Sequence, residues 1–180
     1  VLFFTAMDER LGGQEAARYF LREFGLTESY DSPQATGGDI GADGESNNTI
    51  ANPIDEAYLH ALFISPLGEK NSAYQQRFEG YRDMLLGATN ITDTPINVEW
   101  LELDASSTAS MEDGLKGRLS GCKYQSVLVG SAKLSPAVID VIEENGCHAR
   151  DVPTKVGSFD TSKEIFDRIS ERRMEFAIDQ

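Results

Sequence analysis

Residues 126–159 run Ser126-Val-Leu-Val-Gly130, then Ser135-Pro-Ala-Val-Ile-Asp-Val-Ile-Glu-Glu144, then Thr154-Lys-Val-Gly-Ser-Phe159. The first and third segments are short apolar runs, typical of strands buried on both faces. The middle segment has helical apolar spacing, carries proline in its first turn, and ends at Asn145-Gly146. We therefore expect a strand–helix–strand unit with parallel strands, in which Ser135 caps the helix.

The same alternation continues on both sides of this unit. Further strands are predicted over residues 58–65, 96–103 and 174–178. One further helix is predicted over about 72–86 and ends at Gly87. A second is predicted to begin with a capping box at Ser110 and to end at Leu119, and a third to begin with a capping box at Thr161 and to end at about Arg172. Five strands thus alternate with four helices from residue 58 onward. Strict alternation predicts an α/β fold, a three-layer αβα sandwich with a flavodoxin-like parallel sheet.

The first third of the chain is less regular. Val1-Leu-Phe-Phe4 is typical of a strand and not of a signal peptide, and Asp8 can cap a helix over about 9–23. Residues 26–56 are rich in Ser, Asp, Gly, Asn and Pro. They are interpreted as a polar insertion, with a partner-binding loop as the alternative.

Composition excludes several classes of function. The 180 residues are 40% hydrophobic and 26% charged, which fits one globular domain. The formal net charge of −14 disfavours nucleic-acid binding. No apolar run is long enough to span a bilayer, so we expect no membrane insertion in this segment.

Signals for catalysis are weak. The two histidines, His60 and His148, lie far apart in the sequence, and His60 belongs to an apolar strand. Zinc-protease, Cys-x-x-Cys, nucleophile-elbow and phosphate-loop motifs do not occur. We expect a binding domain that is not an enzyme and needs no cofactor or metal. A small hydrolase on a flavodoxin-like sheet remains the alternative, and it requires a nucleophile–base pair at the strand ends.

Polar residues follow the predicted strands, where open parallel sheets bind their ligands. They are Ser65, Asp104, Ser131, Asp160 and Gln180. Hydroxyl, carboxylate and amide groups together suit a neutral polyhydroxylated ligand. The alternative is that these are ordinary polar loop starts and that Asp160 caps the next helix.

The two cysteines have related positions in the predicted topology. Cys122 and Cys147 each precede a strand, so both fall at the amino-terminal edge of the sheet, opposite the ligand face. This placement is compatible with a structural disulfide and equally with two free thiols.

Four segments resemble the ribose/galactose class of type I periplasmic binding proteins, relatives of the lac-repressor ligand domain. They are Asp8-Glu-Arg-Leu-Gly-Gly-Gln-Glu-Ala-Ala17, Asn71-Ser-Ala-Tyr-Gln-Gln-Arg-Phe-Glu-Gly-Tyr81, Leu134-Ser-Pro-Ala-Val-Ile-Asp140 with Val156-Gly-Ser-Phe-Asp160, and Phe176-Ala-Ile-Asp-Gln180. With the elements between them they cover nearly all of the chain except residues 26–56. The resemblance implies that residues 1–180 form one lobe of a two-lobed clamp, with residues 1–8 as a remnant of the preceding lobe and its crossover.

The resemblance also implies a set of ligand-binding residues. Arg77 falls on the arginine that hydrogen-bonds sugar oxygens, Asp160 on the carboxylate that accepts from sugar hydroxyls, and Gln180 on the amide near a hinge crossing. Ser131 falls where ribose binders carry asparagine, which puts ribose itself in doubt. For Arg77, pairing with a helix carboxylate is the alternative.

The implied function is capture of a sugar or sugar-like molecule for ABC-type uptake or for sensing. The expected partner is a membrane transporter or receptor. The protein is expected to be periplasmic or extracellular. Asn-x-Thr triplets at Asn47 and Asn90 hint at a eukaryotic secretory route. The effector domain of a lac-repressor-type regulator is the alternative, which a helix-turn-helix in a longer polypeptide would decide.

Overall fold

The computed structural model describes residues 2–5, 8–26, 58–68, 72–92 and 94–179. The strands are β1 Leu2–Thr5, β2 Leu59–Pro66, β3 Ile96–Leu103, β4 Ser126–Val129, β5 Lys155–Phe159 and β6 Phe176–Asp179. The helices are α1 Glu9–Glu23, α2 Ser72–Thr92, α3 Thr108–Leu119, α4 Ser135–Glu144 and α5 Lys163–Ser170, with short 3₁₀ turns η1 Ser120–Cys122 and η2 Cys147–Ala149. Apart from the buried Leu26, the predicted insertion at 26–56, with Asn47, lies outside the described residues.

The six strands form one sheet in the order β1-β6-β5-β4-β2-β3, and every neighbouring pair is parallel. From β2 onward this is the flavodoxin-like order, in which the chain reverses direction across the sheet between β2 and β4. The predicted fold class is confirmed. Apolar and polar residues largely alternate along Ile96–Leu103, and this pattern fits the position of β3 at the edge of the sheet.

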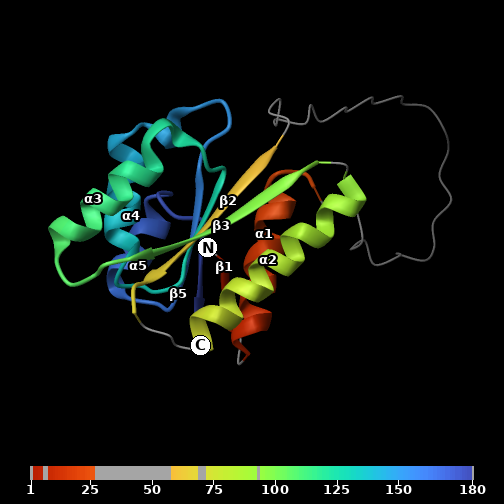
Figure 1. Ribbon diagram of the computed structural model, residues 1–180, viewed down its shortest axis with the longest axis horizontal. Helices are drawn as coiled ribbons and strands as arrows, with labels where there is room; N and C mark the ends of the chain where they lie inside the picture. Colours follow the sequence, from red (N-terminus) through yellow and green to blue (C-terminus); the bar gives the residue numbers. More distant parts are fainter. Residues whose placement is uncertain (1, 6–7, 27–57, 69–71, 93, 180) are drawn as a thin grey trace, which may run out of the picture.

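Helices cover both faces of the sheet, and Figure 1 shows α1 and α2 on one side with α3, α4 and α5 on the other. Successive residues of β2 point to opposite faces, as the strand pleat requires. Phe63 joins the core beneath α1 and α2, whereas Ile64 joins the core beneath α3, α4 and α5. No helix in the described part of the chain is long and apolar enough to cross a bilayer.

Several predicted helix ends are wrong by a few residues. Helix α2 continues past Gly87 to Thr92, because Ala88 is buried in the core and a glycine within a helix costs only about 1 kcal/mol. Ser107, not Ser110, caps α3, and Ser162, not Thr161, caps α5. These two serines have extended backbones, which lets each hydroxyl accept from an N–H three residues later.

One further expectation is corrected. Ser135 does not cap α4, because its hydroxyl is buried and contacts the Ser158 hydroxyl at 2.7 Å. Leu2–Thr5, within the range predicted to be a remnant of a preceding lobe and its crossover, pairs in parallel with β6 at the edge of the sheet, and that domain assignment stays a prediction. Helix α5 ends at Ser170, and Arg172 adopts a left-handed backbone with φ of 60°.

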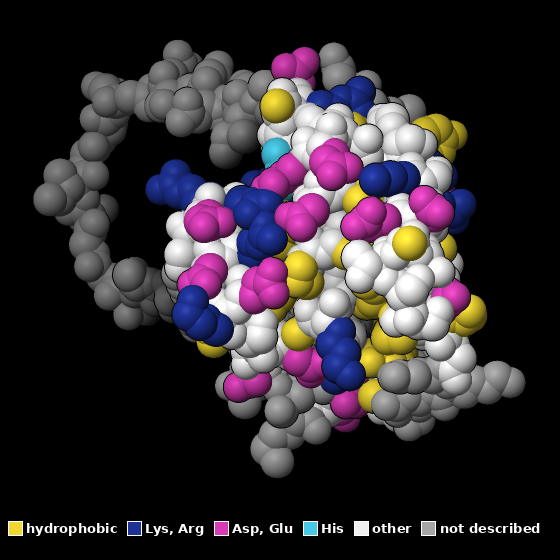
Figure 2. All heavy atoms as spheres, turned by 90° about the vertical axis from the view of Figure 1, so that its left-hand side faces the viewer, with side chains coloured by type: hydrophobic (Ala, Val, Ile, Leu, Met, Phe, Trp, Pro, Cys, Tyr) yellow, Lys and Arg dark blue, Asp and Glu magenta, His cyan; other side chains and the backbone are white. Residues whose placement is uncertain are grey.

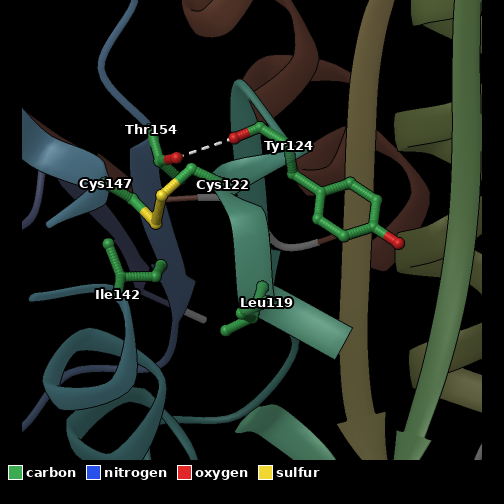
Figure 3. A pocket seen from close by; sticks show the side chains of 6 residues that line it. All are labelled: Leu119, Cys122, Tyr124, Ile142, Cys147 and Thr154. Carbon is green, nitrogen blue, oxygen red and sulfur yellow. Dashed lines mark hydrogen bonds between the residues drawn. A yellow bond between two sulfur atoms is a disulfide. The ribbon is translucent and has the colours of Figure 1, made fainter. Parts of the chain in front are cut away.

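A disulfide joins Cys122 in η1 to Cys147 in η2, with their Cα atoms 5.2 Å apart (Figure 3). The disulfide connects the segments that precede β4 and β5, at the amino-terminal edge of the sheet. Beside it, the Thr154 hydroxyl donates to the Tyr124 carbonyl at 2.7 Å. The bond therefore lies at the opposite edge from the strand ends that were predicted to bind ligand.

Candidate functional site

The reversal point between β2 and β4 places a ligand-accessible edge at the carboxyl ends of these strands. Gly130 follows β4 there, and its N–H donates to the Ile64 carbonyl at 2.7 Å. A Cβ at Gly130 would lie 2.9 Å from Cζ of Phe63, so only glycine fits here without a shift. We call this edge, with Arg77, Gly130, Ser131 and Asp160, the rim.

Arg77, from the second turn of α2, reaches the rim and is 6% exposed. Its Nε donates to Oε2 of Glu9 at 2.5 Å, one terminal nitrogen donates to the Gly130 carbonyl at 2.6 Å, and the other lies 3.5 Å from Oδ1 of Asp160. The guanidinium also stacks over the Phe159 ring at 4.4 Å. The fork of Arg77 therefore joins α1, β4 and the loop after β5.

Asp160 follows β5 and has a left-handed backbone with φ of 63°. Its N–H donates to the Ile178 carbonyl at 2.8 Å, which fixes the loop against β6. Its side chain is 45% exposed and faces Arg77. Asp160 does not cap α5, since Ser162 does so.

The structure brings together three of the four residues implied by the resemblance. Ser131 directly follows the Gly130 carbonyl that Arg77 contacts, is 7% exposed, and its own carbonyl accepts from Leu134 N–H. Gln180 lies outside the described residues. The rim thus gathers Arg77, Ser131 and Asp160 from three separate elements.

Two other strand-end candidates do not join them. Ser65 is 1% exposed, and its hydroxyl accepts from the Trp100 indole at 2.8 Å, so it anchors the edge strand β3. Asp104 follows β3 at the sheet edge and is exposed. Hydrogen bonds from Ser106, including its N–H at 2.9 Å, lower the pKa of the Asp104 carboxyl. Asp104 therefore shapes its own turn.

Glu9 is a member of the site that was not among the sequence candidates. It lies in the first turn of α1, directly after the N-cap Asp8, and so at no strand end. Its partner Arg77 is 68 residues away. The alternative of a helix carboxylate paired with Arg77 is therefore realised, together with the contact to Asp160. The acidic first turn of the helix was the available signal.

Both histidines of the chain lie away from the rim. His60 is the second residue of β2, and its carbonyl accepts from Gln125 N–H just before β4. His148 lies in η2, which precedes β5. Both positions belong to the amino-terminal edge, so neither imidazole can act on a group at the rim. Within the described ranges, no cluster of three or more potential metal-ligating side chains occurs.

The face formed by α3, α4 and α5 mixes basic and acidic side chains closely (Figure 2). Arg168 and Arg173 both contact Asp140 at 3.1 Å. A cavity of about 230 Å³ between α3 and α4 is lined in part by Lys116, which lies 3.7 Å from Glu112 and 3.8 Å from Glu144. These charges are paired with one another, and surface ion pairs of this kind contribute little to the stability of the fold. The rim is therefore the stronger candidate.

The comparisons with known proteins concern the fold. No protein-family model matches the sequence, and no curated protein does. Similar solved structures include GanP, a glucose-galactose binding protein from Geobacillus stearothermophilus, with a TM-score of 0.62 and 13% identity over 94% of this chain and 47% of GanP. AraP, an arabinose binding protein from the same organism, has a TM-score of 0.58 and 12% identity over 95% of this chain and 45% of AraP.

A third similar structure is an ABC transporter periplasmic solute binding protein from Actinobacillus succinogenes with bound D-allose. Its TM-score is 0.60, with 9% identity over 93% of this chain and 46% of that protein. The chain thus spans about half the length of the solved structures that it matches. At these identities the likeness shows the fold alone, and the fold is similar to one lobe of a type I periplasmic binding protein. The resemblance seen in the sequence is confirmed at this level.

Proposed function

We propose that the rim binds a sugar or a sugar-like molecule and that the chain is a binding module. The observation that carries this proposal is the convergence of Arg77 and Asp160, 3.5 Å apart, at the reversal point of the sheet. Similar solved structures are described as sugar-binding proteins, which supports the same assignment. Arg77 anchors the site, while Asp160 and Ser131 offer oxygen atoms to ligand hydroxyls.

We propose further that this lobe works as one half of a clamp that closes on its ligand by hinge bending. Residues 1–8 and Gln180 would then connect it to the opposing half. A single lobe supplies about half of the ligand contacts, so its own affinity should be low. Uptake through an ABC transporter and extracellular sensing are both consistent with such a clamp.

We propose that the protein is periplasmic or extracellular. The disulfide between Cys122 and Cys147 supports this proposal, because structural disulfides form and persist in oxidising compartments. Binding is favoured over catalysis because both histidines lie at the opposite edge of the sheet from Arg77 and Asp160. A serine–histidine pair therefore cannot form at the rim.

The test is a titration of the ¹⁵N-labelled chain with D-glucose, D-galactose, L-arabinose and D-allose, followed by amide chemical shifts. We expect shifts at Gly130, Ser131 and Asp160, with dissociation constants weaker than about 1 mM. Asp160→Asn should abolish these shifts. Asp104→Asn, which neutralises an exposed strand-end carboxylate outside the rim, should leave them unchanged.

Two results would count against the proposal. Shifts that cluster at the amino-terminal edge, or no shift with any sugar, would remove the rim as a sugar site. Binding clearly tighter than millimolar would show that the lobe needs no opposing half.

A further inference from the structure

Resting on the proposed function, we propose that the rim selects its ligand by charge and that Glu9 sets this selection. The ligands it takes are neutral sugars and sugars that carry an ammonium group. Sugar acids and sugar phosphates are rejected. The observation behind this inference is that two carboxylates share the one guanidinium of Arg77.

The geometry makes the carboxylates, and not the arginine, the exposed charges of the site. Oε2 of Glu9 accepts a hydrogen bond from Nε of Arg77 at 2.5 Å, and Oδ1 of Asp160 lies 3.5 Å from a terminal nitrogen of Arg77. The Arg77 side chain is 7% exposed, whereas those of Glu9 and Asp160 are 29% and 45% exposed. A ligand at the rim therefore contacts the carboxylates of Glu9 and Asp160, whereas the guanidinium of Arg77 that they share is buried.

Among the residues that the structure describes, other cations close in sequence to the rim do not compensate this charge. Lys133, which follows β4, lines the cavity between α3 and α4 on the far face of the sheet. Lys163, at the start of α5, is 2.8 Å from Asp167. Arg10, the neighbour of Glu9, donates to Asp83 at 2.6 Å. The formal net charge of −14 for the whole chain acts in the same direction.

Hydrogen-bond chemistry leads to the same ligand class. Ionised carboxylates only accept, so they need partners that donate, and hydroxyl and ammonium groups do so. A carboxylate or phosphate on the ligand would bring a like charge into contact with Glu9 and Asp160, and an ionised carboxylate could donate no hydrogen bond to them. Glu9 sets the selection because without it the charges of Arg77 and Asp160 would balance.

The experiment uses three probes with one ring: D-glucose, D-glucosamine and D-glucuronate. Each is titrated into the chain and followed at the Gly130, Ser131 and Asp160 amides. We expect glucosamine to bind at least as well as glucose, and glucuronate about tenfold more weakly than glucose, because like charges meet at a partly exposed site. Glucuronate binding as well as glucose at these amides would overturn the inference while leaving the proposed sugar site intact.

Glu9→Gln tests the role of Glu9, and Glu15→Gln is its matched control. Both residues lie on α1, pair with an arginine and have similarly exposed side chains, 29% and 31%. Glu9→Gln should reduce the discrimination against glucuronate about threefold or more, since one of two like charges is removed. Glu15→Gln should not change it. Equal effects of the two variants would show that only the overall charge matters and would refute the assignment to Glu9.

A second measurement separates this inference from the proposed function, because it needs no sugar. Sodium sulfate is titrated into the wild-type chain and into Glu9→Gln, and the Nε–H resonance of Arg77 is followed. We expect no response in the wild type and a saturable response in Glu9→Gln. Saturable sulfate binding at Arg77 in the wild type would overturn the charge selection even if no sugar binds. If Glu9→Gln fails to fold, Asp160→Asn, whose side chain is more exposed, takes its place in the sulfate titration.

Discussion

Gly13 of α1 lies against the backbone of Arg77 in α2, so closely that a Cβ at Gly13 would be 2.1 Å from the Arg77 carbonyl oxygen. The contact is reciprocal, because a Cβ at Gly80 of α2 would be 2.0 Å from the carbonyl oxygen of Arg10 in α1. The two glycines let the helix backbones touch. One turn before Gly13, the same approach brings Glu9 within hydrogen-bonding distance of Arg77. The geometry of the rim therefore depends on a glycine contact between two helices.

Gly13→Ala is expected to destabilise the protein by about 3 kcal/mol, because backbone atoms cannot move aside as a flexible side chain can. Gly87→Ala is the matched control within α2, since no atom beyond the neighbouring residues and the backbone of the helix itself lies within 4 Å of a Cβ at that position. It should stabilise the protein by about 0.5–1 kcal/mol. Urea unfolding followed by circular dichroism measures both. An unchanged midpoint for Gly13→Ala would show that α1 and α2 can separate at little cost.

The contrast between these glycines shows what local sequence can and cannot predict. Strands such as Leu59–Pro66 and Ile96–Leu103 are predicted to within about a residue, because the apolar pattern that predicts each of them lies within the strand itself. Gly87 was interpreted as a helix end, but the helix passes through it because Ala88 is buried. The end of α2 is thus determined by packing against other parts of the chain, which a local pattern does not contain.

The residues of the candidate site were likewise predictable where a local pattern marks them and not where a distant contact does. Ser131 and Asp160 were found because both follow strands, and topology brings strand ends together. Glu9 was missed because its role comes from a contact 68 residues away in the sequence. Ser135 was assigned as a cap, yet its hydroxyl contacts Ser158 from the neighbouring strand. Pairings between distant segments were the part that could not be predicted.

Arg77→Lys is expected to cost about 2 kcal/mol of stability, although the charge is kept. A lysine ammonium is a point charge and cannot reproduce the planar fork that contacts Glu9, the Gly130 carbonyl and Asp160 together. Arg18→Lys is the control, because Arg18 is half exposed and pairs with Glu15 on the surface of α1. Its stability should stay within about 0.5 kcal/mol of the wild type. Equal urea midpoints for the two variants would contradict a positioning role for Arg77.

Reduction of the Cys122–Cys147 disulfide is expected to lower stability by about 3 kcal/mol, because the bond closes a loop across a sequence separation of 25 residues. The melting temperature should therefore fall when a phosphine reductant is added. A Cys122→Ser, Cys147→Ser double variant should melt at the lower temperature and be insensitive to the reductant. If reductant leaves the wild-type melting temperature unchanged, the bond does not stabilise this edge of the sheet.

The pH dependence of stability is expected to include a contribution from His148. Burial lowers the pKa of the His148 imidazole, and the nearby carboxylates of Glu143 and Glu175 only partly oppose this effect. Its Nε2 atom is buried and has no hydrogen-bond partner among the residues that the structure describes. Protonation would place an N–H donor at this atom with nothing to accept it.

The folded and unfolded chains take up the His148 proton at different pH values. The unfolded chain takes up the proton on His148 at a pH near 6.5, whereas the folded chain takes it up only at lower pH. Stability from this residue is therefore complete above about pH 6.5 and falls as the pH drops from there towards the folded-state pKa. His148→Gln, which carries no titrating group, should show a shallower loss of stability between about pH 6.5 and 5 in urea unfolding at closely spaced pH values. A wild-type protein that gains stability over this range, or a variant with the same slope, would show that the buried imidazole is not the cause.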